Sequence, residues 1–175
     1  YVYDYIMFNV RNGEIYMIKL KTFGSFTVGN GLTSVQEGAW RSEKLEKLFV
    51  YLAMNRNRGV CIEDISEAIW QVEEETDNPV GALKNLAYRL RKALRDASFG
   101  EECIVSVRGG LYKWNDDVEV TIDVEEFDRY INEAEMAFCR SKETAIESYE
   151  KAIALYHRAF LPLTTDTQCY IPLNA

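Results

Sequence analysis

The sequence predicts an α+β protein that begins with a small antiparallel sheet, continues through three helices and a second hairpin, and ends in helices only. Three observations carry this prediction. Residues 18–35 alternate apolar and polar side chains, as a half-buried strand does. Apolar residues then recur at helical spacing in three segments between 42 and 97, and from 123 onward only helical spacing remains.

Composition sets the broad class of the protein. The chain has 175 residues, of which 47% are hydrophobic and 27% charged, so it is able to bury a core. No stretch approaches the roughly 20 apolar residues that a membrane-spanning helix needs. The start of the chain lacks basic residues and contains Asp4, unlike a signal peptide. We therefore expect a cytoplasmic protein that does not associate with membranes.

The first 116 residues divide into an extension and one domain. Residues 1–16 are interpreted as an extension or linker, and residues 17–116 as the domain. In the expected sheet, Ile18, Leu20 and Thr22 share a face, and Gly29-Asn30-Gly31 favours a hairpin turn.

Helix signals follow the sheet. Ser42 suits the N-cap of a first helix, which ends near 55–59, and a shorter second helix covers about 62–70. Asn78 and Pro79 suit the cap and first turn of a third helix over about 79–97. A hairpin over about 103–114 turns at Gly109-Gly110.

The rest of the chain is predicted to form a second, helical unit. We place the domain boundary in the acidic stretch near 116–123. Helical faces then run through 123–163 with a break near 140–142, and 164–175 are predicted to be an irregular tail. The second of these faces includes Ala145, Ala152 and Ile153.

Positive charge gathers on the third helix, although the formal net charge of the chain is -8. At about 100° per residue, leucines collect on one side of this helix, and between Val80 and Arg95 there are five basic residues and no acidic one. Like charges at i,i+3 and i,i+4 repel, so an anionic partner would relieve the strain. The polar side consists of Lys84, Asn85, Tyr88, Arg89, Arg91, Lys92 and Arg95.

These side chains suit duplex DNA. The Asn85 amide is able to pair with adenine, arginines pair with guanine, and Tyr88 is able to reach a phosphate or a thymine methyl. The order of two helices, a basic third helix and a hairpin bearing Arg108 is that of a winged helix-turn-helix, with a recognition helix for the major groove and a wing for the neighbouring backbone or minor groove.

Several motifs resemble a known bacterial family. Leu90 to Leu94, Ile104 to Gly109 with Tyr112, and Glu63 to Trp70 resemble the C-terminal DNA-binding domain of OmpR- and PhoB-type response regulators, over about 17–116. Asp123 to Phe127, Ala145 to Tyr156 and Phe160 to Pro162 resemble the bacterial transcriptional activator domain of SARP-type regulators, which has tetratricopeptide-like helices.

The resemblance implies roles for individual residues. Asn85, Tyr88, Arg89 and Arg91 fall where the family contacts DNA, and Lys84 and Lys92 share that side of the helix. Arg108 and Tyr112 fall at wing contacts, and Ser106 at a hydroxyl position that reaches phosphate. The loop 73–78 corresponds to a segment implicated in touching RNA polymerase. Regulators of this type often activate transcription and bind direct repeats as dimers, so a homodimer on DNA is one expectation.

Other functions find less support. The single histidine and the four cysteines lack the paired spacing of a zinc site, and no phosphate-binding glycine motif occurs, so we expect no catalytic residues, metal or cofactor. Two alternatives remain open. The winged helix could serve as a protein interaction module without DNA binding, or the chain could be the output fragment of a larger signalling protein.

Overall fold

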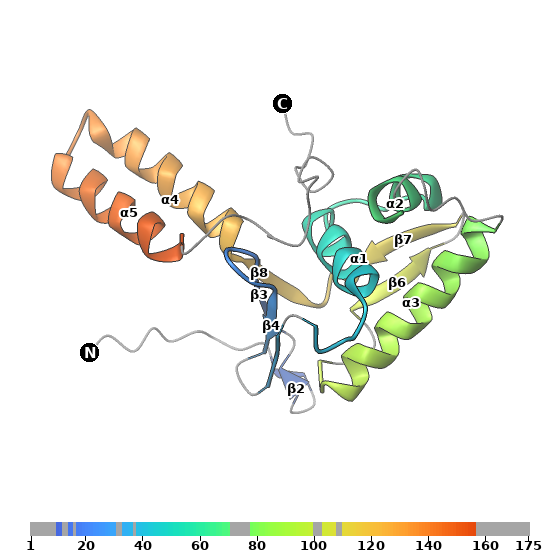
Figure 1. Cartoon of the computed structure of the whole chain (residues 1–175). Helices are drawn as coiled ribbons and strands as arrows, with labels where there is room; N and C mark the ends of the chain where they lie inside the picture. Colours follow the sequence, from blue (N-terminus) through green and yellow to red (C-terminus); the bar gives the residue numbers. More distant parts are fainter. Residues whose placement is uncertain are drawn as a thin grey trace.

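The computed structural model describes residues 10–11, 14–15, 17–30, 33–36, 38–70, 78–99, 103–107 and 110–156 (Figure 1). The expected tail at 164–175, most of the extension 1–16 and most of the loop 73–78 lie outside these ranges. The N-terminal strands are β1 (Val10–Arg11), β2 (Glu14–Ile15), β3 (Met17–Lys21), β4 (Thr27–Gly29) and β5 (Ser34–Gln36).

The main sheet has four strands in the order β5-β4-β3-β8. β4 pairs antiparallel with both β3 and β5, as the alternating pattern predicted, and Val28 lies opposite Leu20. β8 (Glu119–Ile122) pairs parallel with β3. The connection that we predicted at 116–123 therefore contains a strand, and this strand completes the sheet of the first domain.

Three helices and a hairpin follow the sheet, as predicted. The helices are α1 (Glu43–Met54), α2 (Ile62–Ile69) and α3 (Pro79–Asp96). The hairpin consists of β6 (Ile104–Val107) and β7 (Leu111–Trp114), which are antiparallel. Val60, between α1 and α2, pairs with Tyr112 through two backbone hydrogen bonds of 2.8 and 2.9 Å. The hairpin is therefore tied to the helix-turn-helix by backbone as well as by side chains.

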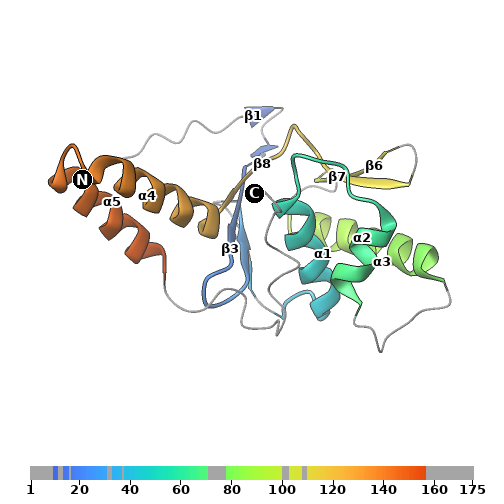
Figure 2. The ribbon, with the colours of Figure 1, turned by 90° about the horizontal axis from the view of Figure 1, so that it is seen from above.

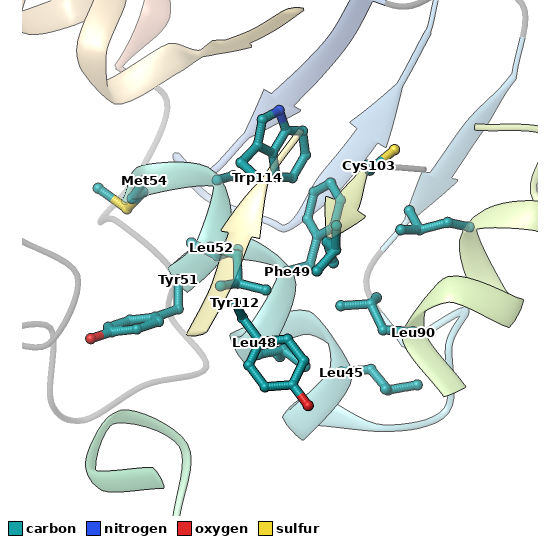
Figure 3. Packing of buried hydrophobic residues seen from close by; sticks show 14 of the residues in the cluster. Leu45, Leu48, Phe49, Tyr51, Leu52, Met54, Leu90, Cys103, Tyr112 and Trp114 are labelled. Atoms are coloured by element: carbon teal, nitrogen blue, oxygen red, sulfur yellow. The ribbon is translucent and has the colours of Figure 1, made fainter. Parts of the chain in front are cut away.

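The core lies between the sheet, α1, α3 and the hairpin (Figure 3). Phe49 of α1 is fully buried and meets Trp114 of β7 edge to face, with ring centroids 5.4 Å apart. The indole N–H of Trp114 donates to the backbone oxygen of Val118 at 2.7 Å, so this buried polar group is satisfied. Leu48 and Leu90 bring α1 and α3 into the same cluster.

The last two helices form a hairpin of their own, α4 (Asp123–Phe138) and α5 (Lys142–Leu155). Small buried residues line their interface: Ala134, Ala145, Ser148 and Ala152. Ile153, which we placed on the packed face, is 69% exposed. The prediction that Ile153 is packed was wrong. Small residues let the backbones of α4 and α5 approach closely, so fewer positions of α5 are buried. Figures 1 and 2 show this helical hairpin extending from the sheet on the side away from α3.

The helical hairpin is attached to the first domain by charged and aromatic contacts. The Asp123 carboxylate accepts hydrogen bonds from the backbone N–H of Thr22 and of Phe23, at 2.8 to 3.0 Å, and from the Thr22 hydroxyl at 2.6 Å. Arg56, just after α1, makes a bidentate pair with Glu125 at 2.6 and 2.7 Å. These bonds fix the start of α4 against both the sheet and the helix-turn-helix.

Candidate nucleic-acid interface

The basic helix α3 is capped at its N-terminus as the sequence predicted. The Asn78 side-chain oxygen accepts from the backbone N–H of Gly81 at 2.9 Å, and Pro79 occupies the first turn. A Cβ added at Gly81 would lie 2.5 Å from the Asn78 amide nitrogen, so glycine is the residue that this cap accommodates.

The C-terminus of α3 is held by the N-terminal sheet, which the sequence did not predict. Ser98 adopts a left-handed conformation with φ of 62°, and Phe99 N–H returns to the Leu94 oxygen at 2.9 Å. The Asn30 amide donates to the Ser98 oxygen at 3.1 Å, and the Thr33 hydroxyl donates to the Ala97 oxygen at 3.1 Å. The β4–β5 turn therefore satisfies backbone oxygens at the end of α3.

Burial divides α3 into two faces. The inner face packs against α1 and α2 and comprises Leu83, Leu86, Ala87, Leu90 and Leu94. The outer face carries most of the predicted contacts, and those in exposed positions are Lys84, Asn85, Tyr88, Arg89 and Lys92. Arg95 and Asp96, in the last turn, are also exposed. Tyr88 is 66% exposed, which is unusual for a large aromatic side chain.

Arg91 lies at the edge of this surface and contacts the wing. Its Nε donates to the backbone oxygen of Ile104 at 3.1 Å, and its Nη2 donates to the Ser106 hydroxyl at 3.0 Å. Arg91 is consequently half-buried, whereas Ser106 is exposed. The arginine and serine that we predicted as separate DNA contacts are joined to each other, and together they fix the wing against α3.

The remaining predicted wing residues are Tyr112 and Arg108. Tyr112 is only 5% exposed and belongs to the core, because its backbone register places it on the same inner face of β7 as Trp114. Tyr112 therefore has a packing role, and its contact with DNA stays a prediction. Arg108 lies outside the described residues. Gly110, two residues further on, has φ of +79°, a conformation that side-chain-bearing residues rarely adopt.

Three cations on the outer face of α3 lack an acidic partner among the described residues. Lys84, Arg89 and Lys92 form no ion pair with any residue in the described ranges, whereas lysines or arginines on α1 and α4 pair within their own helix. Acidic residues of α4 and α5 lie on the helical hairpin, on the far side of the sheet from α3 (Figures 1 and 2). The basic surface and the acidic hairpin are thus spatially separated.

A family model agrees with this architecture. Residues 37–114 match the model described as "Transcriptional regulatory protein, C terminal", the OmpR/PhoB-type winged helix. These residues are therefore similar to that family. Members of this family are transcription regulators that bind DNA, and the match includes α1, α2, α3 and the wing strands. The resemblance predicted from Leu90 to Leu94 and Glu63 to Trp70 is confirmed. The search of curated proteins returned no match.

A solved structure extends the similarity beyond the winged helix. The chain is similar to Mycobacterium tuberculosis EmbR in complex with a low affinity phosphopeptide, with a TM-score of 0.65 and 19% sequence identity. The alignment covers 82% of this chain and 37% of EmbR. Because residues 37–114 are less than half of the chain, the shared fold includes much of the flanking sheet and helices, as the SARP-type resemblance predicted.

The described residues contain no metal cluster and no membrane-spanning helix. In the part of the chain that the structure describes, no three His, Cys, Asp or Glu side chains lie close enough to hold a metal ion. Within the same ranges, no helix combines the length and hydrophobicity that crossing a bilayer requires. At Cys61, the hydrogen bond from Asp64 N–H would lower the pKa of the thiol, but burial and the nearby Asp64 and Glu63 carboxylates outweigh it and raise the pKa.

Proposed function

We propose that this protein is a sequence-specific, DNA-binding transcription regulator that inserts α3 into the major groove. One observation carries the proposal: within the described residues, the outer face of α3 presents Lys84, Arg89 and Lys92 without ion pairs. The start of the helix is capped by Asn78, and its end is bonded to Asn30 of the β4–β5 turn. A rigid helix with an uncompensated basic face suits the phosphate-lined groove of duplex DNA.

The wing follows the path of the groove beside α3. Arg91 bridges α3 to the backbone of Ile104 and to Ser106, so the angle between helix and wing is set before DNA arrives. Pre-organisation of this kind lowers the entropy cost of binding. In this proposal the wing meets the neighbouring backbone or minor groove.

In this proposal the helical hairpin α4–α5 is the start of an activator domain. The proposal assigns no enzymatic activity to the protein. The Asp123 and Arg56–Glu125 contacts support a fixed orientation that keeps the acidic helices away from DNA. Repulsion between these carboxylates and phosphates favours the same orientation. The chain spans 37% of EmbR, so a complete regulator of that length would contain further parts.

The salt dependence of binding tests the proposal. For a mixed-sequence duplex, log K should fall linearly with log salt concentration, and each lost phosphate contact should reduce the slope by about 0.9. We expect Arg89→Ala to weaken binding and flatten the slope. Arg140→Ala, at an exposed arginine of the helical hairpin, is the matched control and should leave both unchanged. Absence of binding at low salt by the folded protein, or equal effects of the two variants, would contradict the proposal.

A further inference from the structure

The outermost stripe of α3 contains few of its charges. At about 100° per residue, Gly81, Asn85, Tyr88 and Lys92 lie within roughly 40° of the direction opposite the buried leucines. These positions follow the spacing i, i+4, i+7 and i+11, so they form one line along the helix. Gly81 has no side chain, and Lys92 carries the one charge of the stripe. Asn85 and Tyr88 are therefore the neutral side chains that project toward a groove floor.

The other cations flank this stripe. Lys84 lies toward the wing side of α3, on which Arg91 bonds to β6, and Arg89 lies on the opposite side. A helix in the major groove meets phosphates along both of its sides and base edges along its centre. The positions therefore assign Lys84 and Arg89 to the two phosphate backbones, and the two hydrogen bonds of Arg91 to the wing withdraw its guanidinium from the base edges.

The chemistry of the two central side chains fits one kind of base pair. A side-chain amide accepts from N6 and donates to N7 of adenine, and an apolar surface contacts the C5-methyl group of thymine. Tyr88 exposes 66% of its surface. Its position on the helical wheel lies between those of Lys84 and Arg89. Contact with a methyl group would bury apolar ring surface, which a phosphate contact through the hydroxyl alone would not.

The spacing of the two residues relates them to neighbouring base pairs. Asn85 and Tyr88 are i and i+3 on one face, so they are separated by about 4.5 Å along the helix axis. One base-pair step is about 3.4 Å. We propose that Asn85 and Tyr88 read two adjacent A·T pairs in the major groove, Asn85 through an adenine edge and Tyr88 through a thymine methyl. This inference rests on the proposed function.

Base analogues test the inference one atom group at a time. A site is first selected from random duplex DNA with the full chain. Each adenine is then replaced by 7-deazaadenine, which lacks the N7 acceptor, and each thymine by uracil, which lacks only the methyl. We expect one adenine replacement to weaken binding at least fivefold and one adjacent thymine replacement to weaken it about fourfold.

Variants assign each effect to its residue. Asn85→Ala should remove the sensitivity to 7-deazaadenine, and Tyr88→Ala the sensitivity to uracil, whereas Tyr88→Phe should keep the latter because its ring remains. Asn132→Ala, at an exposed asparagine of α4, is the matched control and should keep both sensitivities.

The outcomes separate this inference from the proposed function. Tight binding to a selected site that tolerates every analogue, or sensitivities that survive in Asn85→Ala and Tyr88→Ala, would overturn the base-reading assignment and leave DNA binding intact. Failure of the folded protein to bind any duplex would overturn the proposed function itself.

Discussion

Replacing Asp123 tests the attachment between the winged helix and the helical hairpin. The carboxylate is 9% exposed and accepts from Thr22 N–H, the Thr22 hydroxyl and Phe23 N–H. Asp123→Ala would remove the acceptor from all three donors while they remain inside the protein.

The size of the effect follows from these donors. A buried donor left unsatisfied costs about 1–3 kcal/mol, so three give an upper range near 9 kcal/mol. Water entering the vacated space satisfies part of that demand, and we expect Asp123→Ala to lower the free energy of unfolding by about 3–5 kcal/mol. Asp123→Asn keeps one acceptor oxygen but presents an amide to the other donors, so its loss should be about half as large.

Urea unfolding followed by circular dichroism measures these differences. Glu135→Ala is the matched control, since this exposed carboxylate of α4 should change stability by no more than about 0.5 kcal/mol. If Asp123→Ala and Asp123→Asn both unfold within 1 kcal/mol of the parent, the hydrogen bonds of Asp123 do not hold the hairpin. Should the alanine variant not fold, the asparagine variant and the control still decide the question.

Three further predictions concern stability. Leu90 is fully buried, so Leu90→Ala should lower the free energy of unfolding by about 2–5 kcal/mol, and a melting temperature equal to the parent's would show that its burial is wrong. Ser98→Gly should raise stability by roughly 0.5 kcal/mol because φ of 62° favours glycine; a loss in thermal unfolding would contradict this. Burial, followed by the nearby Glu125 charge, raises the pKa of Asp128, so its charge disfavours folding above that pKa. Asp128→Asn should therefore be more stable than the parent at pH 7, with an advantage that declines toward about pH 4, the ordinary pKa of aspartate. A constant difference between pH 7 and pH 4 in urea unfolding would exclude that cause.

Local signals made much of the winged helix predictable. The Asn78-Pro79 pair specified the start of α3, and the observed helix begins at Pro79. Its other end could not be predicted in the same way, since Ser98 takes a position that glycine usually occupies and its partner Asn30 is 68 residues away. Because this cap depends on a distant turn, the sequence near Ser98 does not predict it.

The strand β8 was missed although its sequence alternates. Glu119 and Thr121 alternate with the buried Val120 and Ile122, but the preceding acidic residues suggested a linker. Its partner β3 lies about 100 residues earlier, as the Thr22–Asp123 separation of 101 shows. Parallel pairing over such a distance is a tertiary outcome that a local pattern does not specify.

Some residues of the candidate interface were predictable from the local sequence, and others depended on tertiary packing. The helical wheel alone identified the exposed Lys84, Asn85, Tyr88, Arg89 and Lys92. The contact of Arg91 with Ser106 depends on where the wing packs, and a helical wheel does not predict that packing. The burial of Tyr112 was available from its i,i+2 relation to Trp114, because alternate strand residues share a face.

Selection from random duplex DNA at two salt concentrations tests the central claim most directly. We expect the purified chain to enrich a defined motif and to bind it less tightly as salt rises, because specific contacts come from base edges and affinity from phosphates. A folded protein that enriches no motif at low salt would contradict the assignment of α3 as a recognition helix and would favour a protein interaction module.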